Sequence, residues 1–75
     1  MKLSELKKGE TAIVVSLINS NNLLKRRLLD MGVTKGVEVQ IKKIAPLGDP
    51  ICIELRGYQL CLRKSDLSSI EVNKL

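Results

Sequence analysis

The 75-residue sequence contains no histidine, tryptophan or phenylalanine, a single tyrosine and only two cysteines. Without histidine, the chain lacks the side chain that most often serves as a catalytic base or a metal ligand. With Tyr58 as its one aromatic residue, it lacks the aromatic surfaces on which proteins bind single-stranded nucleic acid or PxxP peptides. These absences argue against histidine-based enzymes, nucleic-acid-binding barrels and peptide-binding SH3 domains, and they require an aliphatic core.

Long apolar runs are also missing. No run exceeds about five residues, whereas a helix needs roughly 20 to cross a bilayer. The first residues, "MKLSELKKGE", lack the apolar stretch of a signal peptide. We therefore expect a cytoplasmic protein without membrane insertion. The net charge of +5 favours anionic partners but identifies none of them.

The order of the patterns predicts a small barrel. We expect residues 1–75 to form a single domain, because this length supports only one small core. Five segments read as strands and one as a helix, with short helical turns near both ends. The expected strands are 11–18, 37–44, 51–55, 59–63 and 70–72, and the expected helix is 23–31. The prediction is a mostly β fold, a five-stranded barrel with one short α-helix after the first strand.

The predicted helix has clear start, face and stop signals. The cluster Asn19–Asn22 supplies side chains that can cap a first turn. Three apolar residues share one stripe at 100° per residue, with Leu23 at its edge: Leu24, Leu28 and Met31. Gly32 stands where a helix commonly ends in a left-handed residue.

Other glycines and prolines mark the turns. Gly36 lies in a tight turn before the second strand, and Gly57 lies at the tip of a hairpin. The segment between the second and third strands is expected to be an ordered turn, and it carries Pro46, Gly48 and Asp49.

The two cysteines lie on the two strands of the predicted hairpin. Alternation puts Cys52 and Cys61 on the same face, opposite the more apolar one. If residues 56–57 form the loop the cysteines face each other, and if residues 57–58 form it they are diagonal neighbours. Both registers keep the apolar face, so the sequence leaves the choice open. With no secretory segment we expect reduced thiols that pack as small apolar residues.

No catalytic or metal-binding set is present in the sequence. There is no glycine-rich phosphate loop, no nucleophile paired with a histidine, and no pair of carboxylates at helical spacing. Two cysteines without histidine fall short of the three or four ligands that zinc or iron requires. We expect no enzyme activity, no resident metal and no cofactor, while a transient contact with ferrous or another transition metal ion stays open.

Several motifs together resemble the FeoA family of bacterial ferrous iron uptake. They run in family order along nearly the whole chain: "LSELKKGE", "RRLLDMG", "VTKG", "APLGDPI" and "LRGYQLCLRKSD". The resemblance implies an SH3-like barrel that acts as a non-enzymatic accessory protein. It also implies a partner, the cytoplasmic GTPase-bearing part of the FeoB transporter, which would recruit the protein to the inner face of the membrane. A similar barrel occurs in DtxR-type repressors, so a transition-metal-linked regulatory domain is one alternative, and a nucleic-acid-binding barrel is the other.

One residue of the helix is a candidate for docking on that partner. On the helical wheel Leu29 lies about 140° from Leu24, between Lys25 and Arg26. The turn "APLGDP" or the N-terminal turn could cover Leu29. Alternatively, Leu29 is an anchor and the two cations steer an acidic surface of the transporter. Leu47, in the exposed turn, is the next candidate.

Overall fold

The computed structural model describes residues 1–18 and 21–75 and contains the predicted elements with small shifts at their ends. In chain order these are η1 (Leu3–Glu5), β1 (Thr11–Leu17), α1 (Asn22–Asp30), β2 (Glu38–Ile44), β3 (Ile51–Leu55), β4 (Tyr58–Leu62), α2 (Lys64–Leu67) and β5 (Ile70–Lys74). Residues 19 and 20 of the predicted capping cluster lie outside the described residues. No helix in residues 1–18 and 21–75 has the length and apolar character needed to span a bilayer.

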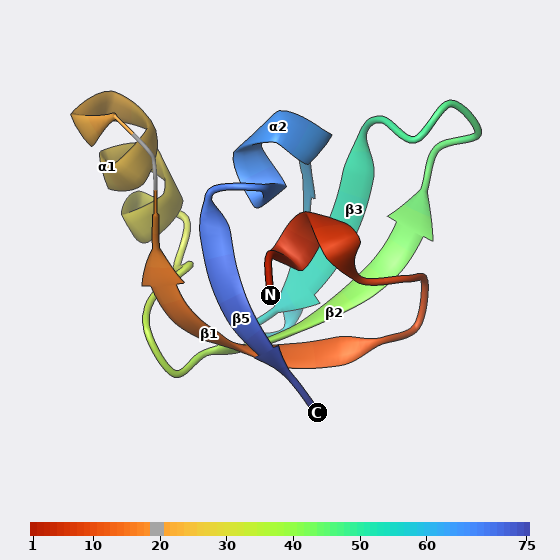
Figure 1. Cartoon of the computed structure of the whole chain (residues 1–75), viewed down its shortest axis with the longest axis horizontal. Coiled ribbons are helices and arrows are strands. Elements are labelled where there is room, and N and C mark those ends of the chain that lie inside the picture. The colour runs from red at the N-terminus through yellow and green to blue at the C-terminus, as the bar shows by residue number, and fades with distance from the viewer. Residues whose placement is uncertain (19–20) are drawn as a thin grey trace.

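The five strands form one antiparallel sheet in the order β4-β3-β2-β1-β5. Figure 1 shows the sheet curling around the interior, with α1 and α2 toward the same end. The register shifts between residues 14 and 16 of β1 and between residues 41 and 43 of β2. Such bulges bend strands and increase their twist, which helps a short sheet to curl. The predicted mostly β, five-stranded fold with a helix after the first strand is confirmed, although no ladder joins β4 to β5 within the described residues.

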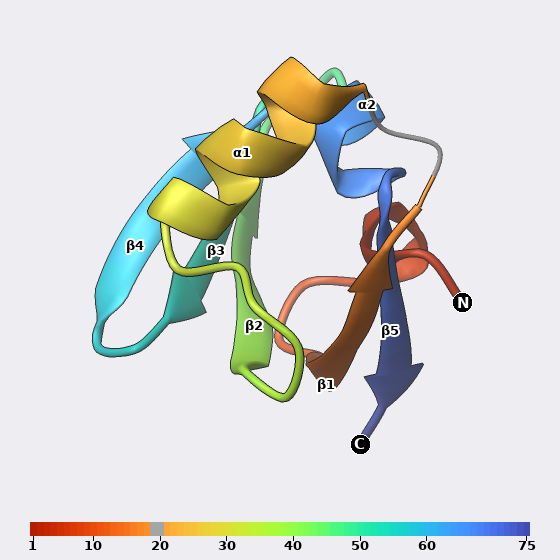
Figure 2. The ribbon, with the colours of Figure 1, turned by 90° about the vertical axis from the view of Figure 1, so that its left-hand side faces the viewer.

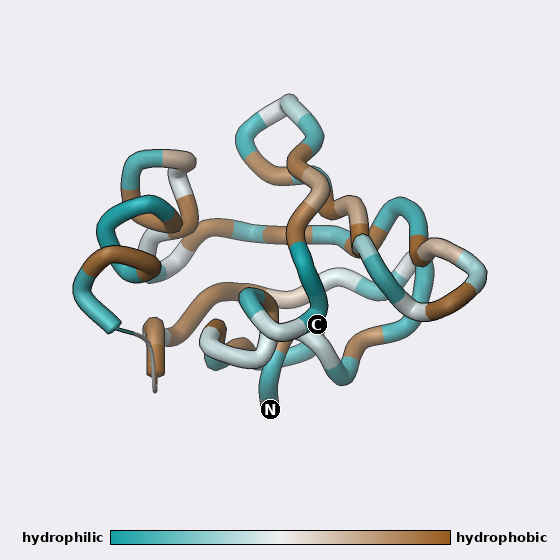
Figure 3. The backbone as a smooth tube through the Cα atoms, turned by 90° about the horizontal axis from the view of Figure 1, so that it is seen from above, coloured by the Kyte–Doolittle hydropathy of each residue, from teal (hydrophilic) through white to brown (hydrophobic). Residues whose placement is uncertain are grey.

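The core is aliphatic, as the composition requires. It is built by alternation along the strands: in β3 the first, third and fifth residues are buried and the two between them are half-buried. Figure 3 shows hydrophobic and hydrophilic positions interleaved along the chain in this way. In β1 only one face is fully buried, with Ala12 and Val14 inside, although nearly every residue of this strand is apolar or β-branched.

The N-terminus covers the outer edge of β5. The backbone N–H of Val72 donates to the carbonyl of Met1 over 2.7 Å, and Lys2 forms an isolated bridge with Glu71. The terminal ammonium of Met1 also pairs with the carboxylate of Glu71. Both chain ends therefore lie beside β5 (Figure 1), and the edge of this strand is not free to pair with another chain.

Glu10 connects the segment before β1 to the end of β5. Its carboxylate forms an ion pair with Lys74 and accepts the backbone N–H of Lys7 over 2.6 Å. These bonds, with that from Lys74 the stronger, hold the pKa of Glu10 below its ordinary value of 4.5. A lowered pKa stabilises the fold above the ordinary value, and this contribution is lost as the pH falls through the folded-state pKa.

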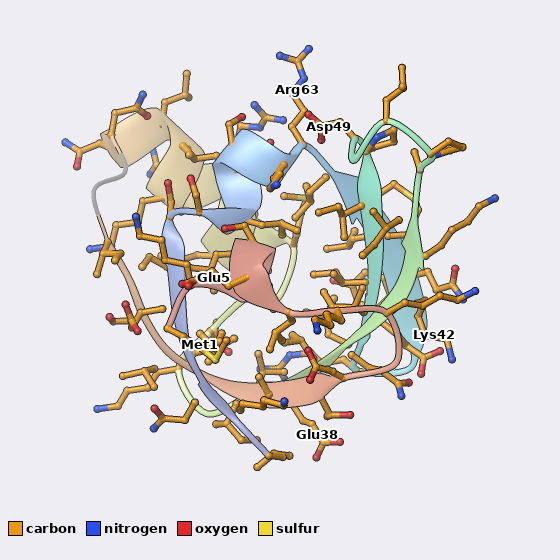
Figure 4. All side chains as sticks on the ribbon, turned by 45° about the vertical axis from the view of Figure 1, so that its right-hand side comes forward. Met1, Glu5, Glu38, Lys42, Asp49 and Arg63 are labelled. Atoms are coloured by element: carbon orange, nitrogen blue, oxygen red, sulfur yellow. A yellow bond between two sulfur atoms is a disulfide. The ribbon has the colours of Figure 1, made fainter. Side chains whose placement is uncertain are left out.

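We therefore expect Glu10→Gln to lose less stability than the wild type on acidification from about pH 5 to pH 3. Thermal melts across this range measure the difference. Glu38→Gln is the control, because Glu38 is an exposed carboxylate on β2 that points away from the sheet (Figure 4). If the melting temperatures of wild type and Glu10→Gln fall equally between pH 5 and pH 3, this carboxylate does not couple folding to pH.

Candidate partner-binding surface

The start of α1 is set by an asparagine cap and its packing by two leucines. The side chain of Asn21 accepts the backbone N–H of Leu24 over 2.7 Å, which satisfies a free donor of the first turn. Leu28 is fully buried, and Leu24 and Met31 pack against the core with partial exposure. The predicted stripe is confirmed. Leu23 departs from it, because this side chain is 70% exposed.

The end of α1 is a Schellman motif built on Gly32. The N–H of Val33 donates to the carbonyl of Leu28 over 2.9 Å, and the N–H of Gly32 donates to that of Leu29 over 3.0 Å. Val33 and Leu28 are both fully buried, so the apolar contact typical of this motif lies in the core. The left-handed conformation predicted for Gly32 is confirmed by its φ of 91°.

The outward face of α1 is formed by Lys25, Arg26 and Leu29. Leu29 is 43% exposed, and both cations are exposed. The alternative in which a turn buries Leu29 is therefore wrong. An apolar side chain between two cations, on a helix that packs only its other face against the core, has the composition of a docking surface for an acidic partner.

Leu47 is even more exposed but belongs to another part of the molecule. It lies at the tip of the β2–β3 turn and is 97% exposed. In Figure 1 this turn and α1 stand on opposite sides, with α2 between them. The residues predicted for partner binding thus form two separate surfaces, the α1 face and the Leu47 turn.

The β2–β3 turn is ordered, as predicted. The N–H of Gly48 donates to the carbonyl of Ala45 over 2.8 Å. The carboxylate of Asp49 accepts the N–H of Lys64 over 2.6 Å, which attaches the turn to the first residue of α2 (Figure 4). Pro46 is exposed in this turn. The role of Pro46, Gly48 and Asp49 is to set the path of the backbone in this turn. Gly36 has the same role in the loop before β2.

The structure resolves the register of the β3–β4 hairpin. Leu55 pairs with Tyr58, so the loop consists of Arg56 and Gly57. Their φ values are 49° and 82°. Two positive φ angles in a two-residue loop are typical of a type I′ turn, whose twist matches that of the flanking strands. The hairpin turn predicted at Gly57 is confirmed.

The expectation of reduced cysteines is wrong in this structure. In the observed register Cys52 lies directly opposite Cys61, their Cα atoms are 4.0 Å apart, and a disulfide joins them. Free thiols were expected because the sequence shows no secretory segment. The sequence leaves the hairpin register open, so it could not show that the two cysteines lie directly opposite each other. The disulfide ties β4 to β3 at the solvent-facing side of the hairpin, where Cys61 is exposed.

Arg56 connects the hairpin to the end of α1. Its Nη2 donates to Oγ1 of Thr34 over 2.7 Å, and its Nε donates to the carbonyl of Gly32 over 3.2 Å. A pocket of about 230 Å³ beside the hairpin is lined by Glu38 and Glu54, but the Arg56 side chain lines it too. Within the described part of the chain no three Cys, Asp or Glu side chains converge as metal ligands would.

The FeoA domain family matches residues 1–74. The chain belongs to the FeoA family. A putative Fe(2+) transport protein A from Campylobacter jejuni is 37% identical over 73 residues, which cover 97% of each chain. A fusion of Fe(2+) transport protein A with the Fe(2+) transporter FeoB, from Porphyromonas gingivalis, is 35% identical over 72 residues. That match covers 96% of this chain and only 8% of the fusion protein.

Solved FeoA structures have the same fold as this family member. FeoA from Chlorobium tepidum superposes with a TM-score of 0.92 at 40% identity, over 100% of this chain and 70% of that one. FeoA from Stenotrophomonas maltophilia, solved with zinc and described as an SH3 domain protein, gives 0.85 at 32% identity, over 97% and 89%. The SH3-like part of the predicted fold is confirmed.

The barrel also occurs in a metal-dependent repressor, as the FeoA resemblance implies. A manganese-dependent transcriptional repressor superposes with a TM-score of 0.91 over 100% of this chain and 36% of its own. The identity is 16%, so this likeness concerns the fold alone.

Proposed function

We propose that this FeoA-family protein is a non-enzymatic accessory of ferrous iron uptake that docks on the cytoplasmic, GTPase-bearing part of FeoB through the α1 face. The observation that carries the proposal is Leu29, which is 43% exposed between two cations on a well-capped helix. The protein would need no cofactor for this role. It would work in the cytoplasm and be recruited to the membrane by its partner.

The fusion protein of Porphyromonas gingivalis supports the choice of partner. It carries a segment similar to this chain and FeoB within one polypeptide. Covalent linkage raises the effective concentration of one module near the other, which is useful when the two act together. A separate chain must achieve the same proximity through a binding surface.

Charge and exposure on α1 fit an acidic site on the partner. Lys25, Arg26 and Arg27 are all exposed, and Asp30 is the one acidic residue of the helix. A cationic surface of this kind speeds association with an acidic one, and added salt weakens the effect. Burial of Leu29 at the centre would then hold the complex together, since apolar anchors ringed by polar groups contribute most of the affinity.

The test is a binding isotherm between the purified chain and the purified cytoplasmic part of FeoB from the same organism. We expect saturable binding that weakens with salt and is lost in the double variant Lys25→Glu, Arg26→Glu. The control is Lys42→Glu, Lys43→Glu, which makes the same change in net charge on β2 (Figure 4). Equal affinities of both double variants would refute docking through the α1 face, and no binding by the wild type would refute the partner.

A further inference from the structure

The outer edge of β4 is unpaired in the described part of the chain. β4 is the last strand of the sheet, and among residues 1–18 and 21–75 its backbone forms no bond to any segment other than β3. Figure 2 shows it at the outside of the molecule with β3 on its inner side. The other end of the sheet differs, because Met1 and Lys2 cover the edge of β5.

Two residues present their backbone groups along this free edge. The pair Leu55 and Tyr58 closes a two-residue hairpin and is hydrogen-bonded. Pair types then alternate along the ladder, which makes Gln59 and Cys61 the members of non-hydrogen-bonded pairs. The Cα separation of 4.0 Å at Cys61 fits the closer type of pair. The N–H and C=O groups of Gln59 and Cys61 therefore point away from β3.

β4 has none of the features with which proteins usually protect a sheet edge. Such edges carry charges, proline or a bulge, or they are covered. The strand reads "YQLCL", without charge or proline, and its pairing with β3 runs through five residue pairs without a shift. Tyr58, Gln59 and Cys61 are exposed. The disulfide fixes β4 against β3, so the edge is already in the conformation that an added strand requires.

The charges beside β4 indicate the chemistry of the added strand. Arg56 precedes the strand and Arg63 and Lys64 follow it, all three exposed. Among the described residues Arg56 forms no ion pair: its side chain bonds to two neutral oxygens, although Glu38 and Glu54 line the same pocket. A second copy paired antiparallel along β4 would bring basic ends against basic ends, which is repulsive. A strand with acidic residues at its ends would instead find a cation at each end.

We propose that the β4 edge binds an extended segment of the partner protein as an added β-strand, with acidic residues flanking a short apolar or polar stretch. The inference rests on the proposed function for the identity of the partner, the cytoplasmic part of FeoB. The two surfaces are neighbours, because a side-chain Cβ added at Gly32, just after α1, would lie 3.2 Å from the hydroxyl of Tyr58. One partner can thus contact the α1 face and extend a strand along β4. Main-chain bonds would supply affinity, and the flanking charges would supply selectivity.

The decisive variant is Gln59→Pro, which removes an N–H that points outward and leaves the β3–β4 ladder complete. Its matched control is Gln59→Ala, which loses the same side chain and keeps the N–H. We expect Gln59→Pro to remain folded and to bind the FeoB cytoplasmic part about tenfold more weakly or worse. Gln59→Ala should bind like the wild type. Protection of the Leu60 and Leu62 amides in the free variant verifies that the ladder is intact.

Amide exchange gives the second readout. In the free wild-type protein the amides of Gln59 and Cys61 should exchange quickly, and binding of the FeoB cytoplasmic part should slow both. Unchanged exchange at Gln59 and Cys61 in the saturated complex would overturn the proposal. Slow exchange without any partner at high protein concentration would show that a second copy occupies the edge, which overturns it too.

A complete lack of binding by the FeoB cytoplasmic part would refute the proposed function. Strand binding at the β4 edge would then be tested with peptides. The probes are synthetic peptides of alternating valine and threonine that end in glutamates or, in the control, in lysines. The proposal requires slower exchange at Gln59 and Cys61 with the glutamate peptide only. No slowing with either peptide would overturn it independently of FeoB.

Discussion

Leu29→Asp is expected to abolish docking on the FeoB cytoplasmic part while the protein stays folded. Leu29 is 43% exposed, lies outside the stripe of Leu24, Leu28 and Met31, and is not part of the core cluster, so the core does not depend on it. Loss of a central apolar anchor typically costs about 2 kcal/mol or more, which corresponds to roughly a 30-fold loss of affinity. The added charge would also oppose the acidic surface that we propose for the partner.

Circular dichroism and a binding isotherm, together with ferrous iron uptake by cells, measure these effects. The free energy of unfolding should fall by about 1 kcal/mol or less, which is the cost of placing an aspartate in the last turn of a helix. Leu47→Asp is the matched control, because it makes the same change at a side chain that is 97% exposed on the other side of the molecule. A folded Leu29→Asp that binds normally, together with a Leu47→Asp that does not, would move the docking site to the Leu47 turn.

Gly32→Ala is expected to cause the largest loss of stability among single-methyl additions at the turns. At a φ of 91°, a residue with a Cβ costs roughly 1–2 kcal/mol. The new methyl group would also lie 3.2 Å from the hydroxyl of Tyr58 and 3.3 Å from Cδ of Arg56. If Arg56 moves to relieve this contact, its bonds to Gly32 and Thr34 are weakened.

Gly57→Ala separates the two contributions in this comparison. Gly57 has a similar φ of 82°, but nothing lies within 4 Å of a Cβ added there. We expect a loss of about 1 kcal/mol for Gly57→Ala and a larger loss for Gly32→Ala, where each kcal/mol lowers Tm by roughly 4–8 °C. Equal melting temperatures for the two variants would show that the contacts around Gly32 are easily relieved. A Gly32→Ala protein as stable as the wild type would contradict the Schellman geometry itself.

The features that the sequence predicts well are local. The end of α1 could be predicted because Gly32 follows a leucine stripe, and the loop glycines mark turns whatever the rest of the chain does. The hairpin strands could also be predicted, because Ile53 and Leu55 alternate with polar neighbours. Their register could not, since both possible loops keep these side chains on the apolar face. Whether Cys52 lies directly opposite Cys61 depends on that register, so the disulfide could not be predicted either.

The sequence predicts poorly which side chains are exposed, because exposure depends on which neighbouring segments pack over them. The exposure of Leu29 depends on the path of the turns around α1. A helical wheel describes only the helix itself and cannot show that path. Leu23 was missed as an exposed residue because it lies at the boundary of the stripe, where a small rotation of α1 decides between core and solvent. The free edge of β4 is likewise a property of the whole sheet. In each case the sequence identifies the element, and tertiary packing determines which side of it is available to a partner.

Contact between the α1 face and the cytoplasmic part of FeoB can be mapped residue by residue by NMR, with the chain labelled and the partner unlabelled. We expect the strongest changes at the amides of Lys25, Arg26 and Leu29 and at the methyl groups of Leu29, while the signals of Leu47 stay unchanged. Changes centred on Leu47, with the signals of α1 undisturbed at saturation, would contradict docking through the α1 face.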